Sequence, residues 1–318
     1  MLVYVGGNRD GADGGENVEL IRVGDAVSRK SHGSDVIFAV LKIISGPARR
    51  AVAVLKGLNA RLVADAPLGD LVRVRQKDIE SAREQVHRLS RESLEKVFLR
   101  RMAEELSATG FRGREADVLP PGLNYGKMPG RVLHLDGDGD YLKNCLRYYQ
   151  ELGVPVVGEH VPEEAQPDKV VPLIRTHLPD ILVLTGHDGL IARRGDRTRL
   201  ENYRTSRYFV EAVRRTRQVE PDKDALVIVA GACQSHYEAI LEAGANFASS
   251  PERVFIHCYD PILVAEKVAF TPFDSVVHVT HAIENTVSGI KGIGGIETRG
   301  KLRLSLPNTG AWATTETA

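Results

Sequence analysis

Two apolar stretches decide the fold: Ile181-Leu182-Val183-Leu184-Thr185-Gly186-His187-Asp188-Gly189 and Leu226-Val227-Ile228-Val229-Ala230-Gly231-Ala232-Cys233-Gln234-Ser235. Each is a run of branched or small apolar residues that breaks at a glycine, which is typical of a buried parallel strand. Functional side chains of α/β folds gather at the carboxyl ends of such strands. We therefore expect His187 and Cys233 to lie at the same edge of one sheet.

This pairing predicts a cysteine nucleophile with its base. A thiolate is the attacking species, so the site must lower the cysteine pKa or supply a base, and His187 would pass the proton to the leaving amine. The capping-box pattern Ser235-x-x-Glu238 predicts a helix that begins just after Cys233 and ends at Gly244. Its N–H groups would favour the thiolate and hold an oxyanion, with Ser235 as a positioning residue.

Other histidine and cysteine residues compete for these roles. His236 would fall in the first turn of the helix after Cys233, where the helix dipole disfavours imidazolium, so it ranks second as the base. Cys145 lies at helical spacing from Leu142 and Tyr149, and Cys258 lies in the strand-like segment 254–258. Free cysteine usually behaves as a small buried hydrophobe, so we expect both to belong to the core.

Composition limits the class of protein. The 318 residues suffice for about two domains, and 42 basic and 42 acidic residues give no net charge that would attract nucleic acid or a membrane. Three cysteines without C-x-x-C pairs favour neither disulfides nor zinc, so we expect no metal and no cofactor. The first 15 residues show no secretion signal and no apolar stretch approaches a membrane span, which predicts a cytoplasmic protein.

The pattern of runs and turns divides the chain. Residues 1–18 read as a flexible leader, and residues 19–77 hold five short apolar runs that predict a small SH3-like β-barrel. Residues 78–130 form a charged helix and a Gly/Pro-rich linker, and residues 307–318 form a tail. Strand and helix patterns then alternate from 131 to 306, with strands expected at 132–135, 154–157, 181–184, 226–230 and 254–257. Five βα units predict a doubly wound parallel sheet, an α/β fold.

Several motifs carry a family resemblance. The runs Met128-Pro129-Gly130-Arg131-Val132-Leu133-His134-Leu135-Asp136-Gly137-Asp138, Gly231-Ala232-Cys233-Gln234-Ser235-His236 and Gly294-Gly295-Ile296-Glu297-Thr298-Arg299-Gly300 resemble the YabG-type sporulation peptidases of endospore formers. The resemblance implies a cysteine peptidase that trims spore-coat and germination proteins after arginine. It also implies synthesis in the mother cell, association with the spore coat, and His187 and Cys233 as catalytic residues.

More distantly, the chain resembles the caspase, legumain and clostripain clan. The 46 residues from His187 to Cys233 are close to the caspase spacing of about 50. Glycine usually follows the histidine in that clan, but here Asp188 precedes Gly189, so either N–H remains a candidate oxyanion donor. The clan often places an acidic or amide residue two positions before the cysteine, where this chain has Gly231, so the charge that reads arginine must come from elsewhere.

We predict that Asp136 and Asp138 supply the substrate arginine's binding site, because they close the first strand of the α/β domain at the same edge. Aspartate can bind guanidinium bidentately. The competing interpretation is that Asp136 caps the following helix. A calcium loop at Asp136 is excluded because its sixth and twelfth positions are Tyr141 and Arg147.

Two other functions remain open. The strand-Asp-x-Asp pattern at Asp136 and Asp138 resembles the opening of Mg-dependent haloacid-dehalogenase phosphatases, although the later strand ends carry Gly-His and Ala-Cys. A non-catalytic scaffold of the spore coat is also compatible, because fold and function separate easily. Natural substrates and oligomeric state are left open by the sequence.

An arginine-directed peptidase would meet its own linker at high effective concentration. We therefore expect self-cleavage near the domain boundary, after Arg100, Arg101, Arg112 or Arg114.

Overall fold

The computed structural model describes residues 20–44, 51–58, 60–110, 126–191 and 196–305. The chain forms two compact units. The first contains Met1–Asn59 and Val63–Arg83, and the second contains Ala60–Leu62 and Glu84–Ala318. The predicted leader 1–18 and tail 307–318 lie outside the described residues, as do Arg112 and Arg114. The short segment Ala60–Leu62 thus belongs to the second unit although its chain neighbours belong to the first.

The first unit contains the five strands predicted for it, in a single antiparallel sheet. They are β1 (Ala26–Arg29), β2 (Phe38–Ile44), β3 (Val52–Gly57), β4 (Val63–Pro67) and β5 (Leu71–Arg73), in the order β4-β3-β2-β1-β5, with the short 3-10 helices η1 (Lys30–His32) and η2 (Leu68–Asp70). Alternate residues such as Ala53 and Leu55 are buried, as the period of two in a strand requires.

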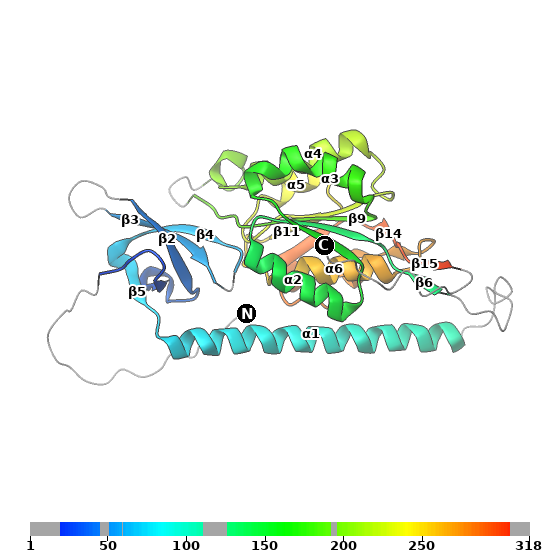
Figure 1. Ribbon diagram of the computed structural model, residues 1–318, viewed down its shortest axis with the longest axis horizontal. Coiled ribbons are helices and arrows are strands. Elements are labelled where there is room, and N and C mark those ends of the chain that lie inside the picture. The colour runs from blue at the N-terminus through cyan, green and yellow to red at the C-terminus, as the bar shows by residue number, and fades with distance from the viewer. Residues whose placement is uncertain (1–19, 45–50, 59, 111–125, 192–195, 306–318) are drawn as a thin grey trace. The chain divides into compact units, whose positions relative to one another are not determined.

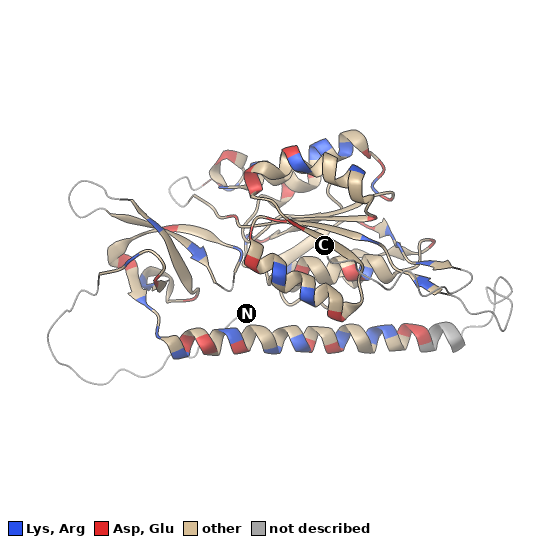
Figure 2. Cartoon of the chain, viewed as in Figure 1, with Lys and Arg blue, Asp and Glu red and all other residues tan. Residues whose placement is uncertain are grey.

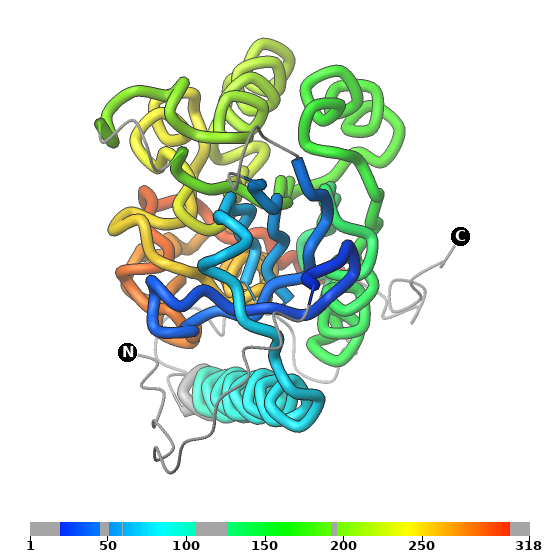
Figure 3. Tube along the Cα trace, turned by 90° about the vertical axis from the view of Figure 1, so that its left-hand side faces the viewer, coloured from blue at the N-terminus to red at the C-terminus, as the bar shows by residue number. Residues whose placement is uncertain are grey.

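Helix α1 (Gln76–Gly110) continues without a break for 35 residues. Acidic and basic residues are interleaved along it (Figure 2), and the view turned by 90° shows the helix nearly end-on as one coil (Figure 3). Val97 is fully buried and joins the core of the second unit. Among the described residues, no helix is both long enough and apolar enough to cross a membrane.

The second unit is built on a six-stranded sheet in the order β13-β11-β10-β9-β7-β8. Its strands are β7 (Val132–Asp136), β8 (Val156–His160), β9 (Ile181–Thr185), β10 (Val227–Ala230), β11 (Phe247–Ser249) and β13 (Ile293–Gly295). All neighbours pair in parallel except β13, which pairs antiparallel with β11. The chain order reverses between β7 and β9, which is where ligands bind in open α/β sheets.

Helices cover both faces of this sheet (Figure 1): α2 (Gly139–Leu152) and α6 (Asp260–Phe270) on one, and α3 (Gln166–His177), α4 (Ser206–Val219) and α5 (Tyr237–Glu242) on the other. Successive strand residues enter opposite cores. Val183 packs in the α2 and α6 core, whereas Leu182 and Leu184 pack in the α3 and α4 core. Because both faces are covered, the central strands β9 and β10 are nearly continuous apolar runs.

The position of the fifth parallel strand differs from the prediction. Segment 254–257 forms no strand, and the fifth strand is Phe247–Ser249, which pairs in parallel with β10. The backbone of Val254 and Ile256 instead bonds the loop after β10, through Gln234 and Cys233. The remaining elements lie outside the main parallel sheet: β6 (Gly126–Met128), η4 (Glu163–Ala165), η5 (Leu200–Asn202), β12 (Val276–Val277), α7 (Val279–Ile283), α8 (Gly289–Gly292), β14 (Thr298–Arg299) and β15 (Arg303–Ser305).

Candidate active site

Strand pairing brings the predicted histidine and cysteine to neighbouring strand ends. Strands β9 and β10 are in parallel register with Leu184 opposite Ala230. His187 and Cys233 each lie three residues beyond this pair, at the carboxyl edge of the sheet. Both are buried, with exposed fractions of 5% and 0%.

The loop after β10 is a tight turn that holds Cys233. Gly231 has a φ of +113°, and a Cβ there would approach Ser249 and Ile240 at 3.1 and 3.3 Å, so glycine is required. Gln234 adopts a left-handed φ of +59°, a strained conformation of the kind that clusters at functional sites. The Cys233 Sγ accepts a hydrogen bond from the Ile256 N–H at 3.3 Å.

Burial raises the pKa of the Cys233 thiol to about 12, against the lowering effect of backbone hydrogen bonds from Ile256 and Arg61 and of the Arg61 charge. The thiol is therefore protonated in this state. The predicted capping box is wrong: α5 begins at Tyr237 with His236 as its N-cap, and Ser235 accepts a hydrogen bond from Ala232 N–H instead. The helix is too far along the chain, and too short, to activate Cys233 as expected.

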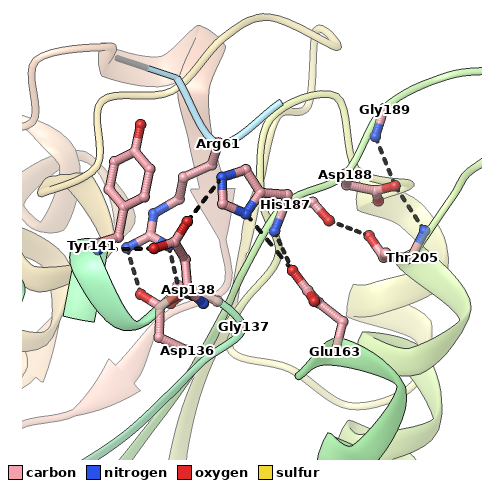
Figure 4. Close-up of polar contacts among 12 residues, drawn as sticks. Arg61, Asp136, Gly137, Asp138, Tyr141, Glu163, His187, Asp188, Gly189 and Thr205 are labelled. Carbon is pink, nitrogen blue, oxygen red and sulfur yellow. Dashed lines mark hydrogen bonds and ion pairs between the residues drawn. The ribbon is translucent and has the colours of Figure 1, made fainter. Parts of the chain in front are cut away.

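Two carboxylates flank the His187 imidazole (Figure 4). Asp138 Oδ2 lies 3.6 Å from Nε2, and Glu163 Oε1 lies 3.8 Å from Nδ1 and accepts the His187 backbone N–H at 2.6 Å. A Cβ on Gly137 or on Gly186 would lie 2.3 Å from the nearest Glu163 side-chain atom. These two glycines therefore make room for the Glu163 carboxylate beside the histidine.

The Asp188 side chain links three loops at the sheet edge. Its buried carboxylate accepts hydrogen bonds from the Gly189 and Thr205 N–H groups and from the Ser206 and Ser235 hydroxyls. Burial raises the pKa of Asp188, and these donors oppose that effect. Two backbone N–H groups after His187 are candidate oxyanion donors. That of Gly189 is bonded to this carboxylate, whereas that of Asp188 is directed away from it.

Asp136 binds an arginine of the chain itself. Its carboxylate receives Nη1 and Nη2 of Arg61 at 2.9 and 2.7 Å, and the Arg61 guanidinium lies 4.7 Å from the Tyr141 ring centroid. Nη2 also donates to Cys145 Sγ at 3.4 Å. We call Asp136, Tyr141 and Cys145 the guanidinium site. Burial alone raises the pKa of Asp136, but the charge and hydrogen bonds of Arg61 outweigh it and bring the value to about 2.

Asp138, and not Asp136, caps helix α2. Its Oδ1 accepts the backbone N–H groups of Asp140 and Tyr141, while Asp136 accepts the backbone N–H of Asp138. The competing interpretation that Asp136 is the cap is therefore wrong. Asp136 binds a guanidinium, and Asp138 caps a helix.

One group of potential metal ligands lies in the described part of the chain, formed by His134, Asp136 and Cys145. The Arg61 guanidinium is bonded to two of these residues, Asp136 and Cys145. Burial lowers the pKa of His134 to about 4, so this ring is neutral beside the pair. The donor set is occupied by a cationic side chain, which disfavours a metal ion at the same place.

The surroundings of His236, Cys145 and Cys258 indicate structural roles for these residues. The His236 Nδ1 accepts the Ala239 N–H and its Nε2 bonds the Thr198 carbonyl at 2.9 Å, so both nitrogens are engaged. Cys145 is buried in α2, and Cys258 is buried in the turn before α6. Burial raises the pKa of Cys258 to about 12.

Comparisons with known proteins identify the family of this chain. Residues 22–307 match the family described as YabG peptidase U57. The chain belongs to the YabG peptidase family. It is 42% identical over 291 residues to the sporulation-specific protease YabG of Bacillus subtilis (strain 168), which covers 90% of this chain and 98% of that protein. No solved structure matches the chain.

Membership of the YabG peptidase family confirms the predicted resemblance and the predicted enzyme class, a peptidase. The sequence interpretation missed Glu163 and Arg61. Glu163 follows β8, whose carboxyl end lies at the same edge as those of β7 and β9, so its position in the βα pattern was a usable signal. Arg61 had no such signal, because it precedes a strand of the other unit.

Proposed function

We propose that this YabG-family peptidase is an arginine-directed cysteine endopeptidase with Cys233 as nucleophile and His187 as proton carrier. The observation that carries this proposal is the strand register that places both residues three positions beyond Leu184 and Ala230. Neighbouring parallel strand ends supply a nucleophile and a base to one substrate, which is the arrangement that covalent catalysis requires.

In the proposed reaction the Cys233 thiol gives its proton to His187 and attacks the carbonyl carbon before the cleaved bond. The Asp188 backbone N–H stabilises the oxyanion, since the Gly189 N–H is engaged by the Asp188 carboxylate. His187 then protonates the leaving amine, and water hydrolyses the thioester. Glu163 orients the imidazole through Nδ1 and the backbone N–H.

The guanidinium site supports arginine specificity. Asp136 binds both Nη atoms of an arginine side chain, and the Tyr141 ring lies under the guanidinium. A bidentate carboxylate with an aromatic face selects arginine over lysine. This site adjoins His187, because the Tyr141 and His187 rings lie 5.5 Å apart.

We further propose that the substrates are spore-coat and germination proteins, cut in the mother cell and at the developing spore. The support is the relative's description as sporulation-specific. A caspase-like fold for the α/β unit and an SH3-like barrel for the first unit remain part of the proposal. The largely parallel sheet with His187 and Cys233 at adjacent strand ends supports the former, and five antiparallel strands support the latter.

The phosphatase alternative is disfavoured by the surroundings of its two aspartates. Asp136 is neutralised by Arg61, and Asp138 is the N-cap of α2, so neither is arranged as a magnesium ligand. The scaffold alternative has no feature of the site in its favour.

A matched pair of reporter peptides tests the proposal: one with arginine before the cleaved bond, the other with citrulline, its uncharged isostere. We expect iodoacetamide-sensitive cleavage and a kcat/KM at least about 30-fold higher for the arginine peptide, the scale of one hydrogen-bonded charge pair. Equal rates would reject the arginine site. Magnesium-dependent release of p-nitrophenol from p-nitrophenyl phosphate would favour the phosphatase, and silence in both assays the scaffold.

A further inference from the structure

The segment Ala60–Leu62 is set apart from its chain neighbours. It belongs to the second unit, although the residues on either side of it belong to the first. Arg61 is 0% exposed, which is rare for a side chain of its charge and length. Such burial needs a specific partner, and that partner is Asp136.

The backbone of this segment follows the loop that carries the proposed catalytic histidine. The Asp188 N–H donates to the Arg61 carbonyl at 3.2 Å, and Leu62 forms a parallel bridge with Asp188. The group proposed to hold the oxyanion thus already holds a carbonyl oxygen of the chain itself. That carbonyl belongs to an arginine.

The proposed nucleophile lies at the same residue. The Arg61 backbone N–H faces the Cys233 thiol and lowers its pKa, against the larger effect of burial. Within one residue, the amide nitrogen and the carbonyl carbon are separated by about 2.5 Å, as bond lengths and the angle at Cα require. The Arg61 carbonyl carbon is therefore close to the Cys233 sulfur, with its oxygen toward Asp188 N–H and its side chain in the guanidinium site.

We propose that Ala60–Leu62 is an internal substrate bound in the active site, and that the Arg61–Leu62 bond is the first bond this peptidase cuts. The inference rests on the proposed function, because it uses the same nucleophile and the same guanidinium site. It differs from the self-cleavage predicted from sequence at the linker arginines, of which Arg112 and Arg114 lie outside the described residues. The other two, Arg100 and Arg101, lie within helix α1 and are bound to buried Glu266.

The covalent steps balance within the chain plus one water. The Cys233 sulfur bonds to the Arg61 carbonyl carbon, the bond from that carbon to the Leu62 nitrogen breaks, and His187 transfers the thiol proton to that nitrogen. Water then hydrolyses the thioester, which returns the thiol and leaves Arg61 with a terminal carboxylate. Leu62 becomes a new N-terminus.

The cut falls between β3 and β4, which pair along five positions from Val52 opposite Pro67 to Lys56 opposite Val63. The two products therefore stay associated through the hydrogen bonds of the first unit's sheet. Until the bond is cut, the Arg61 side chain fills the guanidinium site, and the Arg61 carbonyl accepts the hydrogen bond of the Asp188 N–H. External substrates compete with this segment for both.

The test uses four identical dipeptides. Arg-Leu occurs at Arg61–Leu62, Arg88–Leu89, Arg199–Leu200 and Arg303–Leu304. The last three arginine side chains are 69%, 65% and 53% exposed, whereas Arg61 is buried. The full chain is made by cell-free translation, and its N-termini are followed by mass spectrometry. We expect the Leu62 terminus first, at a rate that does not change when the protein is diluted tenfold. Cleavage first at an exposed Arg-Leu bond, or a rate proportional to concentration, would overturn the inference.

Variants separate this inference from the proposed function. Arg61→Lys keeps the buried charge but loses the bidentate fork, and it should slow formation of the Leu62 terminus at least tenfold, whereas Arg88→Lys should not change it. Cys233→Ala should abolish it. If wild type cleaves the arginyl reporter in a thiol-dependent way while Arg61–Leu62 stays intact, the inference fails and the proposed function stands. If the reporter is not cleaved and no Leu62 terminus forms, both fail.

Discussion

The Ser235 hydroxyl donates a hydrogen bond to the Asp188 carboxylate at 3.0 Å, which ties the loop after β10 to the loop after β9. The same hydroxyl accepts the Ala232 N–H next to Cys233. The distance between the proposed nucleophile and the residue after the proposed base is thus set by one serine. Asp188 acts through its carboxylate on this geometry, in addition to offering its backbone N–H.

Ser235→Ala should lower kcat for arginyl peptides by about tenfold or more with little change in KM, because a misplacement of about 1 Å can cost a hundredfold. Steady-state kinetics on both parameters measures this. The matched control is Ser90→Ala, which removes a serine hydroxyl bonded to the Val86 carbonyl in α1. A rise in KM with unchanged kcat would show that Ser235 acts on substrate binding instead.

Cys233→Ala should reduce kcat/KM at least about a thousandfold, the scale of deleting a nucleophile. Cys258→Ala should retain most activity, because Cys258 is a buried core residue. Thiol labelling followed by peptide mapping provides a second measurement. Since burial raises the pKa of Cys233 to about 12, its alkylation at pH 8 should be far slower than that of free cysteine while Arg61 covers it. Rapid labelling of Cys233 in the uncut chain contradicts that.

Glu163→Gln should lower kcat about 10- to 100-fold while the protein stays folded. Glutamine keeps an acceptor for the His187 N–H but removes the charge that favours imidazolium. Burial raises the pKa of Glu163, so loss of this charge should not lower the melting temperature at pH 7. Kinetics and thermal unfolding on one preparation separate the two effects. Glu164→Gln, on the exposed neighbour, is the control and should be silent in both.

Asp136→Asn should reduce kcat/KM for arginyl peptides about 30-fold and leave citrulline peptides unaffected, because the lost interaction is with the guanidinium. Asp140→Asn, an exposed aspartate two residues before Leu142, is the control. An equal loss of kcat/KM for both peptides would mean that Asp136 shapes the site and does not bind the charge of the substrate arginine.

The Arg61 and Asp136 pair also predicts a pH dependence of stability. The folded-state pKa of Asp136, about 2, is below its ordinary value of 3.8. Its stabilising contribution is therefore complete above about pH 4 and is lost as the pH falls towards 2, amounting to about 2 kcal/mol. Urea midpoints measured across this window in the uncut chain should fall more steeply for wild type than for Asp136→Asn. Parallel slopes would contradict the ion pair.

Glu266 binds the C-terminal third of α1: it is fully buried, and its carboxylate lies 2.7 and 2.6 Å from the guanidinium groups of Arg100 and Arg101. Glu266→Gln should destabilise the second unit by about 3 kcal/mol or more, because two charges lose their buried partner. Limited proteolysis with trypsin should then cut after Arg100 or Arg101, which wild type resists. Glu92→Gln, on an exposed face of the same helix, should change neither result.

Strands β9 and β10 could be read from the sequence because each is a buried apolar run that is followed closely by glycine. Residues 181–184 and 226–230 were found for this reason. Strand β11 was missed because Phe247–Ser249 is only three residues long, and the β-branched segment nearby bonds a loop instead. Propensity alone cannot decide which segment a parallel neighbour selects.

The sequence by itself determined the fold class, the family and the candidate pair His187 and Cys233, because local periodicity and strand ends carry that information. Only the tertiary structure decided what surrounds the pair. Glu163, Asp188 and Arg61 are held there by hydrogen bonds that span 24, 47 and 75 residues of sequence, which no local pattern encodes. The burial of Arg61 depends on a carboxylate 75 residues away, and a charge pair of this kind forms only when the fold removes both partners from water.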